Sequence, residues 1–446
     1  MINRQIKNMS QLIKIALCLL VVFHSSISLA QDTTAVKQPA IWNLQTCLAY
    51  AKQNNIQINS LKLGTKTTEQ ALLLSKSAQL PDLYGSASQS LNHIQGSSIT
   101  NSGSIGLSSS LTVYNGGYLK TDIKQKTLSV KSAELSVEEQ ENTLVIQITQ
   151  AYLNILLDKE SIIYSKDLVK TSRAQLKQAQ QQFSAGSIAR RDVIQFDAQL
   201  ASDTYSLTTA ENAQRQDVLN LKQLLQISHE TEFEVASPDT IKSRVLIPAL
   251  NEVRKFAIEN RPEIKNSEYG VQIAKLDLDK AKSGYLPILS LSGSTGTNYA
   301  SNSSSNYSGT QFNNNFNQQI GLTLSVPIFT RRANKTNTEL AKIAIDQAEL
   351  SLKDTKMLLS QDIEQYYISA LNAQGQFSAA EKQYEYNEEI YRIATEELSL
   401  GAANVFDFYQ QRNLYVQAQQ AYVQAKYNAA LSASIYNFYL GIPVNL

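Results

Sequence analysis

The sequence predicts a mainly α-helical chain whose long coiled-coil helices continue into β-strands of a membrane β-barrel. Three observations predict this fold class. Apolar residues recur every seven positions over stretches far longer than a compact domain needs. Four short segments alternate apolar residues with small polar ones. The whole pattern occurs twice along the chain, which indicates a duplicated unit.

The first 30 residues are expected to be a secretory signal peptide. Basic residues precede an apolar run from Ile15 to Phe23, and Ser28-Leu29-Ala30 resembles a cleavage site. A membrane anchor is the alternative, but the run is shorter than the roughly 20 residues that a spanning helix needs. Cys18 lies inside this run, so Cys47 would be the single cysteine after cleavage and no intrachain disulfide could form.

The composition excludes several classes of protein. The 446 residues carry a net charge of +1, which gives no electrostatic reason to expect a nucleic-acid partner. No stretch after the signal peptide is apolar enough for a transmembrane helix. If the exported chain crosses a membrane, it must therefore do so with strands.

Two structural repeats are predicted at residues 31–248 and 249–446. Residues 44–88 align with residues 250–294 at a constant offset of 206 positions, and from Ile105 onward the offset is 215. The second copy is therefore longer by nine residues, which fall in the polar stretch 296–319. We expect an exposed loop there, because insertions in surface loops cost little.

Each repeat is expected to contain the same helices in the same order. A short helix ends at Asn54-Asn55 or at Asn260-Arg261-Pro262, and a helix of about 25 residues then runs to the residue before Pro81 or Pro287. After two strands come a long helix, a glycine and a returning helix. The expected ranges are about 43–54 and 249–260 for the short helices, about 118–185 and 332–400 for the long ones, and ends near 229 and 440 for the returning ones.

The strands are expected at about 82–92, 104–114, 287–297 and 319–329. In the second of them, Ile105, Leu107, Leu111 and Val113 share one face, and small polar residues share the other. This alternation is typical of a barrel wall between lipid and a lumen, although a half-buried soluble sheet is the alternative. Four strands are fewer than the roughly eight of the smallest closed barrel. A barrel therefore requires oligomerisation: two chains would supply eight strands and three would supply twelve.

The heptad spacing predicts two long antiparallel hairpins. Their seam positions are Ile148, Ile155, Ile162, Val169, Leu176 and Phe183 in the first repeat, and Ile363, Ala370, Phe377, Tyr384, Tyr391 and Leu398 in the second. Aromatic residues at this spacing indicate helix packing rather than a ligand site. At 1.5 Å per residue, each long helix would extend roughly 100 Å.

A glycine interrupts each hairpin, at Gly186 and at Gly401. Glycine supplies the left-handed backbone that ends a helix, and an acid follows in each copy, at Asp192 and Asp407. An ordinary helical turn is one interpretation of these segments. The other is a tip with a function of its own.

These features together resemble the outer membrane efflux protein (TolC) family, from Leu44 to Ile442. The resemblance rests on the duplication, on the proline-ended helix that leads into a strand, on Val113-Tyr114-Asn115-Gly116-Gly117 before the long helix, and on the Gly-x5-Asp turn. In the second copy, Thr330-Arg331-Arg332 stands where the family often has Asn-Gly-Gly.

The resemblance implies a homotrimer, with twelve strands in one outer-membrane barrel, surrounded by lipid, and twelve helices in a periplasmic tunnel. It implies a Gram-negative type envelope and a passive exit duct of a tripartite efflux or type I secretion system. The partners would be a periplasmic adaptor (membrane fusion) protein and an inner-membrane pump of RND or ABC type. A non-conducting structural coiled-coil protein is the alternative function, and the lipid-type alternation of the strands counts against it.

The resemblance also indicates which tip residues are functional. Asp407 matches a family aspartate at the constricted periplasmic entrance, whereas Gln410 and Ala403 replace a second aspartate and an arginine. The candidate adaptor contacts and tip residues are Gly186, Ser187, Arg190, Arg191, Asp192 and Gly401. Helix-terminal electrostatics for the two aspartates, and a solvated turn for the others, are the alternatives.

No enzymatic activity, metal or cofactor is expected. His24, His93 and His229 are isolated from cysteines and from acidic clusters. No phosphate-binding loop or dinucleotide-binding motif occurs in the sequence.

Overall fold

The computed structural model describes residues 41–93, 95, 99–228, 233–238, 243–244, 246–301 and 308–444. The predicted signal peptide lies outside the described residues, as do His24 and His229. Everything below concerns the unit Ile41–Leu446.

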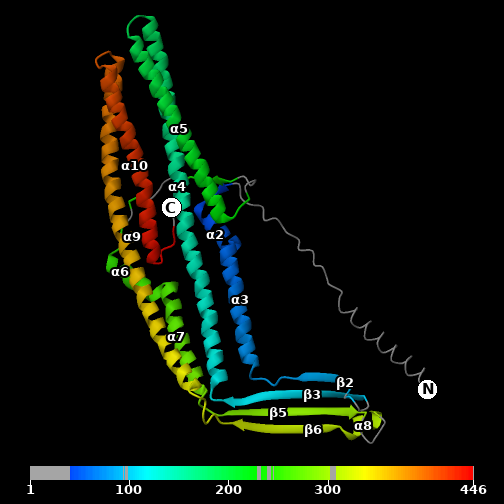
Figure 1. The fold of residues 1–446 in the computed structure, drawn as a ribbon. Coiled ribbons are helices and arrows are strands. Elements are labelled where there is room, and N and C mark those ends of the chain that lie inside the picture. The colour runs from blue at the N-terminus through cyan, green and yellow to red at the C-terminus, as the bar shows by residue number, and fades with distance from the viewer. Residues whose placement is uncertain are drawn as a thin grey trace, which may run out of the picture. The chain divides into compact units, whose positions relative to one another are not determined.

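Strands from both repeats form one four-stranded antiparallel sheet in the order β2-β3-β5-β6 (Figure 1). Its strands are β2 (Tyr84–Asn92), β3 (Thr100–Asn115), β5 (Ile288–Ala300) and β6 (Asn317–Ser325). The two repeats meet where β3 pairs with β5, from Ser102 opposite Ala300 to Asn115 opposite Ile288. β2 and β6 are left as the two edges of this sheet.

The register collects the apolar residues of three strands on one face of the sheet. Opposite residues of antiparallel strands point to the same side, so the pairs Leu111–Leu291 and Leu291–Leu322 extend one apolar row across the sheet. The members of this face are Ile105, Leu107, Leu111, Leu289, Leu291, Ile320, Leu322 and Leu324. Serine, glycine and threonine dominate the other face, as in the row Ser108–Ser294. Most of the apolar face is exposed in the single chain.

Two details at the end of the sheet differ from the expectation. β6 ends at Ser325 instead of continuing to about 329, because Pro327 cannot donate a hydrogen bond to a neighbouring strand. The sequence predicts a loop at 296–319, but β5 extends to Ala300 and the short helix α8 (Ser308–Asn314) follows. Gln311 of α8 donates through Nε2 to the carbonyl oxygen of Ala300 and so holds the helix against the strand.

The helices repeat in the same order in both halves of the chain. The first half contains α2 (Leu44–Asn54), α3 (Ile56–Ser77), α4 (Tyr118–Ser184) and α5 (Arg190–Leu225). The second half contains α6 (Leu250–Asn260), α7 (Pro262–Ser283), α9 (Ala333–Ser399) and α10 (Val405–Tyr439). α4 and α9 have 67 residues each, so each is roughly 100 Å long.

The breaks between the short helices have local causes. The side chain of Asn55 accepts hydrogen bonds from the backbone N–H groups of Gln57 and Ile58 and thereby caps α3. Pro262 occupies the first turn of α7, where its missing N–H costs nothing.

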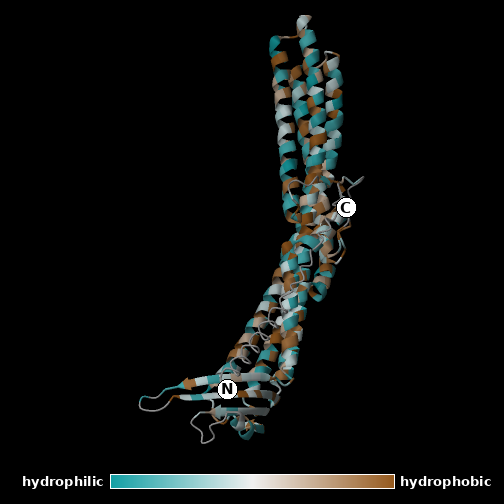
Figure 2. Cartoon of the chain, turned by 90° about the vertical axis from the view of Figure 1, so that its right-hand side faces the viewer, coloured by the Kyte–Doolittle hydropathy of each residue, from teal (hydrophilic) through white to brown (hydrophobic). Residues whose placement is uncertain are grey.

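Polar and apolar residues are interspersed along every long helix (Figure 2). No helix in the described part of the chain is both long and apolar enough to cross a bilayer.

The heptad positions form the cores of the two hairpins, α4–α5 and α9–α10. Ile148, Ile155, Ile363 and Phe377 are buried, whereas Phe183, next to the tip, is 44% exposed. In the second hairpin the rings stack in sequence, with centroids 5.1 Å apart for Tyr384–Tyr422, 4.9 Å for Tyr391–Tyr415 and 5.8 Å for Tyr391–Phe408. The aromatic stripe is therefore a packing seam between α9 and α10.

A two-stranded parallel β-pair packs against the middle of α4 and the end of α5. β1 (Ile41–Trp42) pairs with β4 (Glu234–Val235), and neither strand was predicted from the sequence. Trp42 is fully buried in a core that also contains Leu221 and Leu225 of α5. The hydroxyl of Tyr152 donates to the carbonyl oxygen of Ala236, 2.6 Å away, and thus ties α4 to the connector between the repeats.

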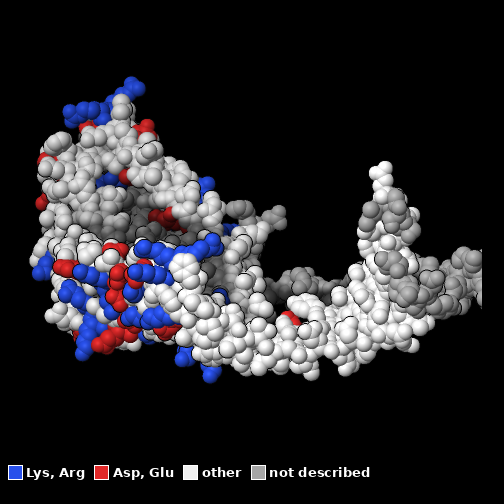
Figure 3. Space-filling view, turned by 60° about the horizontal axis from the view of Figure 1, so that its bottom comes forward, with Lys and Arg blue, Asp and Glu red and all other residues white. Residues whose placement is uncertain are grey.

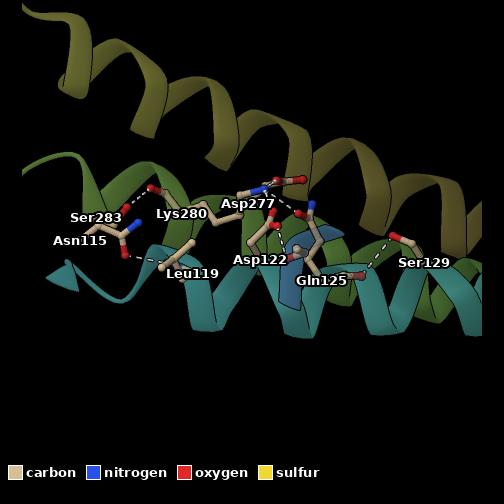
Figure 4. Close-up of polar contacts among 9 residues, drawn as sticks. Asn115, Leu119, Asp122, Gln125, Ser129, Asp277, Lys280 and Ser283 are labelled. Atoms are coloured by element: carbon tan, nitrogen blue, oxygen red, sulfur yellow. Dashed lines mark hydrogen bonds and ion pairs between the residues drawn. The ribbon is translucent and has the colours of Figure 1, made fainter. Parts of the chain in front are cut away.

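A polar cluster joins three helices next to the sheet (Figure 4). Lys280 of α7 donates to Asp122 and Gln125 of α4, at 2.7 Å each, and Ser75 of α3 donates to Asp122 at 2.5 Å. Burial alone would raise the pKa of Asp122, but the hydrogen bonds from Lys280 and Ser75 outweigh it and hold this pKa below its usual value.

The link from strand to long helix differs between the repeats in sequence but not in backbone. Gly116 and Gly117 have φ angles of 64° and 83°, and at the matching positions Arg331 and Arg332 have 48° and 70°. The left-handed conformation costs a residue with a Cβ roughly 1–2 kcal/mol. The two arginines therefore hold strained backbone where the first repeat has glycine.

The variant Arg332→Gly is expected to raise the free energy of unfolding by about 1 kcal/mol, because glycine adopts this backbone without strain. Denaturant titration of the purified protein measures the change. Arg332→Ala is the control, since it removes the charged side chain and keeps the Cβ. Equal stabilities of the two variants would show that the backbone at this position is not strained.

Candidate functional site

Each hairpin tip is closed by the same hydrogen-bonded turn around a glycine. The N–H of Gly186 donates to the carbonyl of Phe183 and the N–H of Ser187 to that of Gln182, both at 2.9 Å. The N–H of Gly401 likewise donates to Leu398, and that of Ala402 to Glu397. These two bonds define a Schellman motif, which requires a left-handed residue, and the glycines have φ angles of 76° and 75°.

The predicted aspartates stand at equivalent positions in the first turn of the returning helices. In the first tip, Asp192 accepts the N–H of Ala189 at 3.3 Å. In the second, Asn404 caps α10: its Oδ1 accepts the N–H of Asp407 at 2.9 Å, and its Nδ2 donates to the carboxylate of Asp407 at 2.5 Å. Both acids thus stabilise a helix start, where negative charge is favoured.

The side chains of the two tips differ in charge. Arg190 and Arg191 are exposed, and Arg191 Nε lies 3.5 Å from the carboxylate of Asp192. The hydroxyl of Ser187 is used within its turn, where it donates to the carbonyl of Gln182 at 2.8 Å. Asp407 and Gln410 are exposed on α10.

A cleft of about 960 Å³ lies between the two tips. Four of the predicted tip residues line it, namely Ser187, Arg191, Asp192 and Gly401. Gly186, Arg190, Asp407 and Gln410 are not among its lining residues. The structure therefore brings part of the predicted set together in one cleft.

An apolar core below the cleft joins the two hairpins. Ala179 of α4, Phe196 of α5, Ala394 of α9 and Phe408 of α10 belong to one buried cluster. The ring of Phe196 lies 5.4 Å from that of Tyr409, which connects the returning helices directly. The tips are thus positioned relative to each other by packing of all four helices.

A buried ion pair reinforces this connection, and sequence reasoning missed it. Arg412 of α10 is 1% exposed, and its Nη2 lies 2.5 Å from Oδ2 of Asp203 and 3.0 Å from Oγ of Ser172. Gln199 completes the site by donating to Oδ1 of Asp203 at 3.0 Å. Removing one member would leave a buried charge without its partner, which costs roughly 3–5 kcal/mol.

The described residues contain no cluster of three or more histidine, cysteine or acidic side chains that could hold a metal ion. His93 follows the end of β2, far along the chain from the tips. The cleft between the tips is lined by charged, polar and apolar side chains.

The family model for outer membrane efflux proteins matches residues 48–225 and 253–434, which is most of both repeats. Toxin and drug export protein A of Aggregatibacter actinomycetemcomitans is 26% identical over 310 residues, covering 68% of this chain and 64% of that protein. The match thus spans slightly less than two thirds of that relative's length.

Two further comparisons agree. Outer membrane protein TolC of Vibrio cholerae is 25% identical over 338 residues, covering 73% of this chain and 74% of that protein. The crystal structure of the CmeC outer membrane channel of Campylobacter jejuni has the same fold. It matches with a TM-score of 0.77 at 20% identity, over 90% of this chain and 87% of that one.

The resemblance that the repeats indicated is therefore confirmed, and so is the location in the outer membrane. The family is one of channel and transport proteins rather than of enzymes. The chain belongs to the outer membrane efflux protein family.

Proposed function

We propose that the protein is a homotrimeric channel-tunnel, the passive exit duct of a tripartite efflux or type I secretion system. One observation carries the proposal. A sheet with an apolar face and two open edges continues directly into two hairpins with helices of 67 residues. The sheet suits a bilayer, and the hairpins are long enough to extend far into the periplasm.

The absence of charge from the strands supports their position in lipid. β2, β3, β5 and β6 contain no Lys, Arg, Asp or Glu. Figure 3 shows the contrast with the helices, where both signs of charge are dense. A charge facing the centre of a bilayer costs roughly 2–4 kcal/mol in a barrel, so an uncharged wall is what lipid selects.

The edges β2 and β6 support oligomerisation. In lipid, each unpaired backbone group costs several kcal/mol, so an open sheet cannot remain there. Pairing β6 of one copy with β2 of the next closes the wall. Three copies give the twelve strands that the family resemblance implies, and the helices that follow the strands would then surround the same axis.

The hairpin tips would be the periplasmic gate of this tunnel. Three copies of Asp407 around the axis would form a ring of carboxylates at the entrance, which attracts cations. The exposure of Asp407 in the single chain supports this role. Gln410 leaves the ring with less charge than a second aspartate would provide.

The exposed tips also suit contact with partners. Arg190 and Arg191 project from the first tip, and the cleft between the tips offers polar and apolar contacts to a docked segment. The proposed partners are a periplasmic adaptor protein and an inner-membrane pump of RND or ABC type. The name of the relative from Aggregatibacter, toxin and drug export protein A, is consistent with either small molecules or proteins as cargo.

Purified trimers inserted into planar lipid bilayers are expected to form discrete, cation-selective pores, because the wall would enclose a polar lumen with acidic residues at its entrance. Single-channel recording with a salt gradient measures conductance and selectivity. Trimers that insert without any conductance would contradict the duct and favour a structural coiled-coil protein.

The variant Asp407→Asn is expected to weaken block by a trivalent cation at least tenfold, because it removes the carboxylate while an amide can still bond to Asn404. Titration of the blocking ion during bilayer recording measures the change. Gln410→Asp is the matched variant of opposite sign and is expected to strengthen block. If Asp407→Asn leaves block unchanged, Asp407 only stabilises the start of α10.

A further inference from the structure

Besides Asp203, the seam of the first hairpin contains a second charged residue, to which the proposed transport function gives no role. Asp158 of α4 is 8% exposed and stands between the seam residues Ile155 and Ile162. Its Oδ2 is buried and has no hydrogen-bond partner among the described residues. An isolated carboxylate in such a place is unfavourable, so its charge must be balanced or removed.

The group that faces Asp158 is another carboxyl, Asp217 of α5, close enough to share a hydrogen bond with it when one of the two is protonated. This layer repeats the one that holds Ser172 and Asp203. Asp158 precedes Ser172 by two heptads on α4, and Asp217 follows Asp203 by two heptads on α5. The layer of Ser172 and Asp203 also contains Arg412. The layer of Asp158 and Asp217, here called the lower layer, has no arginine.

The lysines that stand nearest to the lower layer in the heptad register have contacts with other groups. Lys426 of α10 is two heptads after Arg412, yet its Nζ lies 2.9 Å and 3.0 Å from the two carboxylate oxygens of Glu160.

The flanking lysines also have other contacts. Lys159 of α4 donates to the carbonyl of Val235 in β4 at 2.6 Å and lies 3.9 Å from Glu234. Lys222 of α5 lies over the ring of Phe233, 5.9 Å from its centroid. The charge that raises the pKa of Asp158 is that of Asp217.

The electrostatics follow from this arrangement. Burial raises the pKa of Asp158, and the negative charge of Asp217 raises it further, to about 7. Asn220 donates to Oδ1 of Asp217 at 3.1 Å. Below about pH 7 Asp158 is protonated, and its O–H can donate to Asp217.

We propose that Asp158 and Asp217 form a proton-binding carboxyl pair that makes the packing of α4 against α5 depend on pH. With the proton bound, one hydrogen bond joins the two helices across the seam. When the proton leaves to water, two like charges face each other in a buried layer and the interface loosens. This device concerns contacts within one chain, so it holds or fails independently of the proposed transport function.

The direction of the pH effect is fixed by the raised pKa. Unfolded Asp158 ionises near its ordinary value of about 3.9, and folded Asp158 near 7. The pair contributes its full stability below about pH 4 and loses it as pH rises to about 7. Over that range the folded-to-unfolded ratio attributable to Asp158 falls by up to about tenfold per pH unit.

The test compares wild type with Asp158→Asn, whose amide is the uncharged counterpart of the protonated carboxyl. Denaturant titrations between pH 4.5 and pH 8.5 are expected to show that wild type loses stability relative to this variant as pH rises, by about 100-fold or more in total. Asp197→Asn on the exposed side of α5 is the matched control and is expected to retain the wild-type pH dependence. The same pH dependence in Asp158→Asn as in wild type would overturn the proposal.

Infrared difference spectroscopy between pH 5 and pH 8.5 tests the protonation itself and needs no unfolding. Wild type and Asp197→Asn are expected to show the carbonyl band of a protonated carboxyl that disappears at high pH, and Asp158→Asn to lack it. The absence of this band from wild type would overturn the proposal. So would stabilisation of wild type at pH 8 by millimolar Ca²⁺ that Asp158→Asn abolishes, since the pair would then bind a metal ion rather than a proton.

Discussion

The unpaired edges of the four-stranded sheet are the constraint on which the rest of the proposed assembly depends. β2 and β6 each leave one row of backbone N–H and C=O groups without a neighbouring strand among the described residues, and a bilayer offers no water to satisfy them. Closure by further copies is the solution that keeps the apolar face towards lipid. Because a long helix follows the second strand of each repeat, closure of the wall would also arrange the hairpins around the same axis and gather the tips at one entrance.

The hairpins are held together by seams of apolar residues, and a few charged residues interrupt these seams. Arg412 and Asp203 form a buried ion pair, supported by Ser172 and Gln199, which fixes one hairpin against the other below the tips. Asp158 stands in the same register without a cation, and proton binding is the physical alternative to pairing. Equivalent positions of the seam thus hold a permanent ion pair in the layer of Asp203 and, in our proposal, a pH-dependent carboxyl pair in the layer of Asp158.

Elements with a long local period could be predicted from the sequence, and those that depend on distant partners could not. The heptads give α4 and α9, and the alternation gives the sheet, because each pattern records which side of an element is buried or exposed to lipid. β1 and β4 are two residues each and pair across nearly the whole first repeat, so no local pattern marks them.

The same distinction applies to the tips. The glycine turns and the positions of Asp192 and Asp407 follow from the sequence, whereas the cleft, the cap by Asn404 and the partner of Arg412 required the fold. Arg412 stands one helical turn after the seam residue Phe408, and this position was the one sign in the sequence that its charge could be buried. The roles of the tip residues in gating and docking, and the repeat boundaries at 248 and 249, stay predictions.

The measurement that tests the central claim most directly is the native mass of the detergent-solubilised protein. The account predicts a particle of three chains, and a particle of one or two chains would contradict it.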